Sequence, residues 1–281
     1  MEKEGLARSQ TGADRRSRPP PGRVRTAAAV ASFLLAGWGA PALAEDPGCH
    51  AHQPIVSIRT GVARLAARLR HHDPVRILAI GSSSTQGIGA SSPAFSYPAQ
   101  LEADLGRTWD HSVHVENAGK AGETISETVG RLEAALGSTE PDLVIWQVGT
   151  NDAVNGGDEV QFSALLKRGI DAARALGVDV LLVDQQYYPA ITDLVRYERF
   201  VNLVGTTASA EQVPVFSRYK LMKTWSEQAP EVLVSMLSGD GFHLGDRGYD
   251  CMAQLIADSL QALAAPASAS SGSTVAAAVR P

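Results

Sequence analysis

Between residues 54 and 264 the chain alternates short apolar runs with longer segments of helical periodicity, and this alternation limits the folds open to it. Five apolar runs are typical of strands buried on both faces: Val75–Ile80, Val113–Val115, Leu143–Val148, Val178–Val183 and Val213–Phe216. Six segments have helical spacing: Ile55–Leu69, Tyr97–Leu105, Thr124–Leu136, Val160–Leu176, Asp193–Leu203 and Tyr249–Leu263. Strands that alternate with helices predict an α/β three-layer sandwich with a parallel sheet of about five strands.

The first 44 residues lack this alternation. They begin with a basic segment, continue with an apolar, Ala-rich stretch from Thr26 to Trp38, and end in Pro41-Ala42-Leu43-Ala44. A basic start, a short apolar core and an Ala-x-Ala ending are typical of a secretory signal peptide, and we expect cleavage after Ala44. The alternative is a transmembrane anchor, but the apolar core is short for a span of ~20 residues. We therefore predict a secreted or periplasmic protein without a stable membrane anchor.

Composition adds a boundary and excludes one class of partner. The segment 266–281 is rich in Ala, Ser and Gly without a helical stripe, so we expect a disordered tail after one domain at 45–265. The whole chain has a formal net charge of −5, and the basic N-terminal segment makes the remainder more acidic still. An acidic domain is not expected to bind phosphate backbones, so nucleic acid is excluded as a partner.

Both cysteines, Cys49 and Cys251, lie in the expected mature part. In an oxidising compartment they can form a disulfide that closes a loop of about 200 residues and contributes a few kcal/mol. The alternative is two unpaired buried thiols. The stretch from Cys49 to His52 resembles a metal-ligand cluster, but it offers too few ligands for a zinc site, and we predict no metal.

Four polar motifs stand at expected strand ends or late loops. Gly81–Gly87 follows the first strand, Asn117–Gly122 the second and Gly149–Asp152 the third, and Asp240–His243 lies near the C-terminus. In open parallel sheets, functional groups gather at the carboxyl ends of the strands, beside the switch in strand order. Asp152 is equally suited to capping the helix that follows it.

These residue types suit acyl transfer, which needs a nucleophile, a base, a group that orients the base, and donors for the oxyanion. A serine at the turn from the first strand into a helix is exposed, and its backbone N–H lies near the positive helix end. His243 can serve as the base, and Asp240 can bond its other ring nitrogen. The backbone N–H of Gly122 and the side-chain amide of Asn151 are candidate oxyanion donors.

In this order the motifs resemble those of the SGNH (GDSL-type) hydrolase family, over nearly the whole region from Val75 to Leu263. The resemblance implies a flavodoxin-like α/β/α fold and ester hydrolysis through an acyl-enzyme, with neither a metal nor an organic cofactor. The family's Gly-Asp-Ser block places the nucleophile at Ser83, rather than at Ser82 or Ser84.

The other blocks of the family imply the remaining site residues. Its second block gives Gly122 as the oxyanion glycine, which acts with the N–H of Ser83, and its Gly-x-Asn-Asp block gives Asn151. Its Asp-x-x-His block gives Asp240 and His243 as members of the triad.

Two features depart from this set or extend it. Ser82 replaces the family's usual Asp, which is not a triad member, so we expect the chemistry to survive with altered bonding in the loop. Tyr187 and Tyr188, just past the fourth predicted strand, are candidates for lining the acyl or leaving-group pocket. Packing in the core is the alternative for these tyrosines.

Other functions compete with the esterase. In an FMN-binding, flavodoxin-like electron carrier the Ser/Thr-rich loop would cradle a phosphate, but Asn151, Asp240 and His243 would have no role. A non-catalytic carbohydrate-binding protein would have no need of a triad. Among esterases we favour short acyl or acetyl esters of small molecules or glycans, because no long apolar lid is evident. A lysophospholipase or thioesterase of the same family is the alternative.

Overall fold

The computed structural model describes residues 49, 55–57 and 61–265, and the expected signal peptide and C-terminal tail lie outside them. The strands are β1 (Val75–Gly81), β2 (Val113–Gly119), β3 (Leu143–Gln147), β4 (Asp179–Val183) and β5 (Val215–Phe216). The helices are α1 (Ala63–His71), α2 (Ser83–Gln86), the 3-10 turn η1 (Pro93–Phe95), α3 (Tyr97–Thr108), α4 (Ile125–Thr139), α5 (Thr150–Val154), α6 (Glu159–Ala175), α7 (Leu194–Ala210), α8 (Arg218–Gln228), α9 (Pro230–Met236) and α10 (Asp246–Ala264). None of these helices is long and apolar enough to cross a membrane.

All five strands are parallel, in the order β2-β1-β3-β4-β5. This is the flavodoxin-like order, in which the chain runs outward from β1 to β2 and then returns past β1 to β3. The predicted α/β/α fold is therefore confirmed. The strand order reverses between β1 and β3, so the crevice for a site lies where these two strands end.

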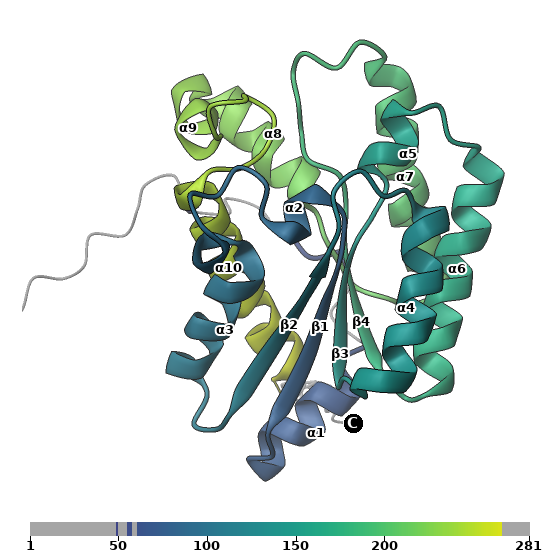
Figure 1. Ribbon diagram of the computed structural model, residues 1–281, viewed down its shortest axis with the longest axis vertical. Helices are drawn as coiled ribbons and strands as arrows, with labels where there is room; N and C mark the ends of the chain where they lie inside the picture. The colour runs from purple at the N-terminus through teal and green to yellow at the C-terminus, as the bar shows by residue number, and fades with distance from the viewer. Residues whose placement is uncertain (1–48, 50–54, 58–60, 266–281) are drawn as a thin grey trace, which may run out of the picture. The chain divides into compact units, whose positions relative to one another are not determined.

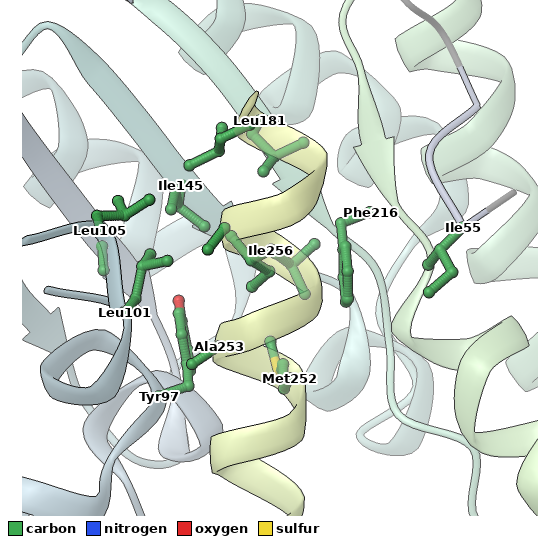
Figure 2. Packing of buried hydrophobic residues seen from close by; sticks show 14 of the residues in the cluster. Ile55, Tyr97, Leu101, Leu105, Ile145, Leu181, Phe216, Met252, Ala253 and Ile256 are labelled. Atoms are coloured by element: carbon green, nitrogen blue, oxygen red, sulfur yellow. The ribbon is translucent and has the colours of Figure 1, made fainter. Parts of the chain in front are cut away.

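The sheet separates two hydrophobic cores because successive side chains of a strand point to opposite faces. In β1, Ile77 and Ala79 join one core, and Leu78 and Ile80 join the other. Helices α1, α3 and α10 cover the first face, and α4, α6 and α7 cover the second (Figure 1). Figure 2 shows α10 crossing the first core, with Ile256 among the side chains of the sheet.

The segment before α1 differs from the prediction. We expected a helix over Ile55–Leu69, but α1 begins at Ala63, and Gly61 has a φ of +101°, which breaks helical geometry. Val56 instead forms an antiparallel bridge with Phe216 of β5. The N–H of Ser57 donates to the carbonyl of Val215 over 3.2 Å. The segment 55–57 thus satisfies backbone groups that the edge strand would otherwise leave unpaired.

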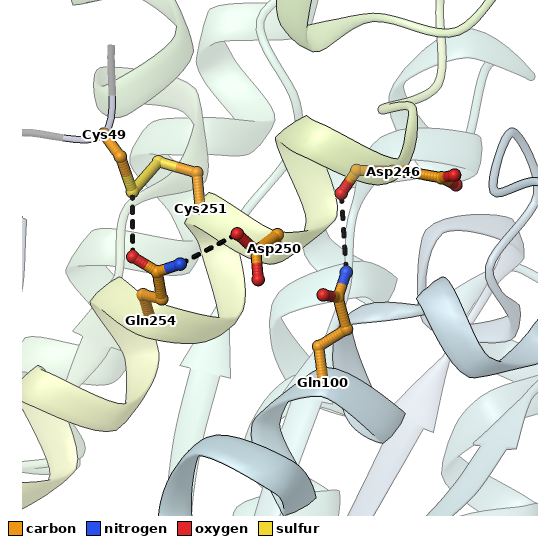
Figure 3. The surroundings of a disulfide bond; sticks show 6 residues. All are labelled: Cys49, Gln100, Asp246, Asp250, Cys251 and Gln254. Atoms are coloured by element: carbon orange, nitrogen blue, oxygen red, sulfur yellow. Dashed lines mark hydrogen bonds between the residues drawn. A yellow bond between two sulfur atoms is a disulfide. The ribbon is translucent and has the colours of Figure 1, made fainter. Parts of the chain in front are cut away.

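A disulfide joins Cys49 to Cys251 of α10, with a Cα–Cα distance of 5.2 Å. Figure 3 shows the bridge beside Gln254, whose Oε1 lies 3.7 Å from the sulfur of Cys49. The predicted pairing is therefore present in the structure. It ties the N-terminal arm to the helix that fills the first core.

Candidate active site

The turn that follows β1 carries the predicted nucleophile. Ser83 is the first residue of α2, and Ser82 precedes it as the N-cap residue. The backbone N–H and the hydroxyl of Ser82 both donate to Oε1 of Gln147, over 2.9 and 3.0 Å. Gln147 is the last residue of β3, which pairs with β1, so the strand beside β1 fixes the turn that carries Ser83. Sequence reasoning missed Gln147, although a polar residue that ends an apolar strand is a detectable signal.

Ser83, His243 and Asp240, the three residues of the expected triad, lie together in the structure. Oγ of Ser83 is 2.9 Å from Nε2 of His243, although 160 residues separate them in the chain. Nδ1 of His243 is 2.6 Å from Oδ2 of Asp240. Hydroxyl, imidazole and carboxylate therefore form one continuous hydrogen-bonded chain, which is the geometry of a serine-hydrolase triad.

The surroundings of Asp240 keep its carboxylate ionised. Its Oδ1 accepts hydrogen bonds from the hydroxyl of Ser238 over 2.7 Å and from the N–H groups of Phe242 and His243, each over 2.9 Å. Burial raises the pKa of Asp240, but the hydrogen bonds from His243, Ser238 and Phe242 outweigh it, so the pKa lies well below its usual range. An ionised Asp240 favours the tautomer with a proton on Nδ1, which leaves Nε2 free to accept the proton of Ser83.

The loop that carries the histidine is itself fixed; we call residues 237–244 the base loop. Leu237 and Leu244 form an antiparallel bridge across it, and the N–H of Ser238 donates to the carbonyl of His243 over 2.8 Å. The ring of Phe242 makes an edge contact with the ring of His243, at a centroid distance of 4.9 Å. These contacts limit the rotation of the imidazole.

One hydrogen bond connects Asn151, a predicted oxyanion residue, to the loop that carries the other, Gly122. Asn151 is the second residue of α5, directly after β3, and its Nδ2 donates to the carbonyl of Glu123 over 2.7 Å. Gly122 immediately precedes Glu123, is exposed, and has a φ of +82°. Because an amide nitrogen carries two hydrogens, Asn151 can hold the loop and still offer one donor to a substrate.

Helix α4 and helix α2 both anchor this glycine loop. Glu123 is only 7% exposed, and its carboxylate pairs with the guanidinium of Arg131, whose Nε lies 2.8 Å from Oε2. Arg131 also donates to the carbonyl of Ala118 over 2.8 Å. From the other side, Oε1 of Gln86 accepts a hydrogen bond from the N–H of Ala121 over 2.7 Å. The loop is therefore tied to the helix that carries Ser83.

Asp152 caps a different helix from the one expected. Its carboxylate accepts a hydrogen bond from the N–H of Ile125, the first residue of α4, over 3.0 and 3.2 Å to its two oxygens. Asp152 lies inside α5, whose N-cap position is taken by Gly149, so it points to the neighbouring helix instead of its own. Burial raises its pKa, against the opposing hydrogen bond from Ile125.

A pocket of about 370 Å³ opens beside the base loop. Its lining comes from the end of α5, the segment after β4, the start of α7 and the base loop: Ala153, Val154, Gly156, Tyr188, Ala190, Ile191, Thr192, Asp193, Arg196, Tyr197 and Phe242. Tyr188 lines this pocket and makes an edge contact with Phe242 at a centroid distance of 5.0 Å. Tyr187 packs instead against Tyr219 in the core, 5.5 Å between centroids. Of the two candidate substrate-binding tyrosines, only Tyr188 reaches the pocket.

No three His, Cys, Asp or Glu side chains of the described segments are grouped so that they could hold a metal ion. His50 and His52, which follow Cys49 in the sequence, lie outside the described residues.

Comparisons with known proteins identify the family of the chain. A model of the non-GDSL lipase-like family matches residues 48–266. Esterase TesA from Pseudomonas aeruginosa is 31% identical over 144 residues, which span 50% of this chain and 70% of that esterase. The crystal structure of TesA has a TM-score of 0.58 at 25% identity, and the match covers 67% of this chain and 99% of TesA.

A third comparison concerns the fold alone. A two-domain esterase active on acetylated mannans has a TM-score of 0.60 at 23% identity, over 74% of this chain and 56% of that one. The family match sets aside the electron-carrier and pure-binding interpretations of the fold. Ser82, which stands where the Gly-Asp-Ser block has Asp, agrees with a family that is described as non-GDSL. The chain belongs to the non-GDSL lipase-like family, and it is an SGNH-type enzyme that hydrolyses ester bonds.

Proposed function

We propose that this protein is an exported serine esterase that acts on short acyl or acetyl esters, with Ser83 as nucleophile, His243 as base and Asp240 as the group that orients the base. The observation that carries the proposal is the hydrogen-bonded chain from Ser83 Oγ through the imidazole to the carboxylate, at 2.9 and 2.6 Å.

In the first half-reaction, Nε2 of His243 takes the hydroxyl proton of Ser83 while Oγ attacks the ester carbonyl carbon. The carbonyl oxygen becomes an oxyanion, which accepts hydrogen bonds from the backbone N–H groups of Ser83 and Gly122 and from the amide of Asn151. Collapse of the tetrahedral intermediate breaks the bond to the alcohol oxygen. The imidazolium returns its proton to that oxygen, and an acyl-enzyme remains on Ser83.

In the second half-reaction, His243 takes a proton from water, whose oxygen attacks the acyl carbon. The new intermediate collapses, Ser83 recovers its proton from the imidazolium, and the carboxylic acid leaves. Asp240 stays ionised throughout and stabilises the imidazolium of both half-reactions.

The size of the neighbouring pocket supports a small substrate group. At about 370 Å³ the pocket beside Phe242 lies near the lower limit of ligand pockets. Its lining is largely apolar, with Val154, Ile191 and the ring of Tyr188, so it suits a short acyl chain better than a long one. The two-domain esterase with the same fold acts on acetylated mannans, so acetylated glycans are included in the proposal.

Export of the protein is part of the proposal. The disulfide between Cys49 and Cys251 supports it, because such bonds persist in oxidising compartments and are rare in the bacterial or eukaryotic cytosol. The expected signal peptide over residues 1–44 has the matching composition. The N-terminal sequence of the protein recovered from an expressing culture tests this part, and it should begin at Glu45.

A fluorophosphonate probe tests the nucleophile. The wild-type protein should be labelled and should hydrolyse p-nitrophenyl acetate, and Ser83→Ala should lose both properties. Ser82→Ala serves as a matched control, because it removes a neighbouring hydroxyl and leaves Oγ of Ser83 in place. If Ser83→Ala is still labelled, another residue is the nucleophile.

A series of p-nitrophenyl esters from acetyl to palmitoyl tests the substrate class. We expect kcat/KM to be highest for the shortest acyl groups and to fall as the chain outgrows the pocket. A maximum at long acyl chains, or faster cleavage of acyl thioesters, would favour the lysophospholipase or thioesterase alternative. A panel of acetylated polysaccharides then separates glycan esters from small-molecule esters.

A further inference from the structure

One buried glutamine touches both halves of the site. Gln186 lies three residues after β4 ends and is only 2% exposed. Its Oε1 accepts a hydrogen bond from the hydroxyl of Ser84 over 3.2 Å. Its Nε2 donates to the backbone carbonyl of Phe242, also over 3.2 Å. Ser84 follows Ser83 and Phe242 precedes His243, so one amide connects the immediate neighbours of the nucleophile and of the base.

The glutamine is held firmly enough to act as such a connection. Its own carbonyl accepts a hydrogen bond from the phenolic hydroxyl of Tyr197 over 2.8 Å, and Tyr197 is 1% exposed. Two residues earlier, the carboxylate of Asp184 accepts hydrogen bonds from Ser217 over 2.6 Å and from the N–H of Tyr219 over 2.9 Å. Residues 184–186 are therefore fixed on α7 and α8, independently of the nucleophile turn and the base loop.

The side chain at this position needs both a donor and an acceptor. The hydroxyl of Ser84 is buried and needs an acceptor, and the carbonyl of Phe242 can only accept. A primary amide supplies one of each at the end of a three-bond side chain. Methionine has nearly the same length and shape but offers neither function.

We propose that Gln186 is a positioning residue, which keeps α2 and the base loop in register so that Ser83 Oγ and His243 Nε2 remain within hydrogen-bond distance. The inference rests on the proposed function, because it gives Gln186 a role only if Ser83 and His243 react. Gln186 itself touches neighbours of the reacting groups and no reacting atom.

The effect should appear in kcat. A displacement of about 1 Å between reacting groups can lower the rate on the order of a hundredfold. We expect Gln186→Met to lower kcat for p-nitrophenyl acetate at least about tenfold and to leave KM within about twofold. The same variant should react more slowly with the fluorophosphonate probe, in proportion to kcat.

The adjacent glutamine is a matched control. Gln185 is 0% exposed, and neither its side-chain oxygen nor its nitrogen has a hydrogen-bond partner among the described residues. Gln185→Met therefore makes the same chemical change at a buried site that bridges nothing. If Gln186 merely supports the fold, Gln186→Met should lower the melting temperature and still have the kcat of Gln185→Met. A loss of kcat specific to Gln186→Met identifies positioning.

A double-mutant cycle tests the connection to Ser84. Ser84→Ala alone should lower kcat, because it removes one of the two side-chain hydrogen bonds of Gln186. In the Gln186→Met background, Ser84→Ala should lower kcat no further, since the hydrogen bond between these two side chains is already absent. Additive losses in the cycle would overturn the proposal. Should Gln186→Met fail to fold, Gln186→Asn takes its place, because its amide is one methylene too short to span both partners.

The outcomes separate this inference from the proposed function. If Ser83→Ala abolishes activity while Gln186→Met and Gln185→Met have the same kcat, the inference fails and the triad stands. If Ser83→Ala remains active, the proposed function itself fails.

Discussion

Gly89 lies against His243 so closely that a Cβ on this glycine would stand 3.0 Å from the Cβ of the histidine. The same atom would collide with the backbone oxygen of Leu244. Gly89 also has a φ of +96°, a conformation that other residues rarely adopt. The segment after α2 and the base loop therefore approach at a point where only glycine fits.

Gly89→Ala should consequently lower kcat without removing any group of the triad, because the added methyl pushes the base loop away from Ser83. Strain at the positive φ should also lower the melting temperature. Gly106→Ala is the matched control, since Gly106 lies in α3 and its added Cβ would meet no heavy atom within 4 Å. This control should keep full activity and gain up to about 1 kcal/mol in the free energy of unfolding. Equal kcat values for the two variants would contradict the close fit.

Asn151→Ala should lower kcat on the order of a hundredfold or more, because the variant lacks the amide donor for the oxyanion. The loss should fall mainly on kcat, since the oxyanion exists only after attack. The hydrogen bond to the carbonyl of Glu123 is lost as well, so part of the effect is a looser glycine loop. Asn155→Ala changes an exposed asparagine just past the same helix and should leave kcat unchanged. A rise in KM at constant kcat would argue against the oxyanion role.

Asp179 should make the stability of the fold depend on pH in a defined direction. Burial raises the pKa of Asp179 to about 6, against the opposing bonds from the N–H groups of Leu65 and Arg64. The pKa of an aspartate in an unfolded chain is about 4. Between these two values the folded chain holds the proton more tightly than the unfolded chain, so protonation of Asp179 stabilises the fold as pH falls from 6 towards 4. The energetic cost of the buried charge is complete above pH 6.

Asp179→Asn removes this titration while it keeps an oxygen for the N–H of Leu65. The free energy of unfolding of the variant, relative to wild type, should therefore be more favourable at pH 7 than at pH 4.5. Urea unfolding of both proteins at the two pH values measures this difference, in which the titration of all other groups cancels. A relative stability that is the same at both pH values would mean that the Asp179 carboxyl titrates normally.

The disulfide should contribute to stability and leave catalysis unchanged. It joins residues 202 positions apart, and a loop of that length corresponds to an entropic stabilisation of up to about 5 kcal/mol. Cys49→Ala should lower the melting temperature by the same amount as reduction of the wild type, and reduction should not affect the variant further. Its kcat should match the wild type, because Cys49 contacts α10 and lies apart from the triad. A variant as stable as the oxidised wild type would show that the bridge contributes little.

The strands and the site motifs could be predicted from the sequence because both leave local signals. The inner strands β1, β3 and β4 are almost fully buried and form continuous apolar runs, whereas the edge strand β2 is largely exposed and extends beyond its predicted bound to Gly119. The approach of His243 to Ser83 followed from four ordered motifs at strand ends. The choice of Ser83 among three consecutive serines needed the resemblance to a family, because all three have the same local chemistry.

Other features depend on contacts between distant segments, and these give no local signal. Helices α2 and α5 have four and five residues, which is too short to display a helical period. Helix α8 mixes polar and apolar residues because it contributes to both cores, so it has no single stripe. The bridging role of Gln186 depends on two partners 102 and 56 residues away, which only the folded chain brings together.

The long sequence separation between Ser83 and His243 has a consequence for biosynthesis. Ser83, the proposed nucleophile, is synthesised early, and His243, its proposed base, follows 160 residues later on the segment that leads into α10. A nascent chain that still lacks this segment carries an ordinary serine hydroxyl with no imidazole to activate it. We therefore expect ester cleavage to start only after the base loop and α10 have been synthesised and α10 has packed on the sheet.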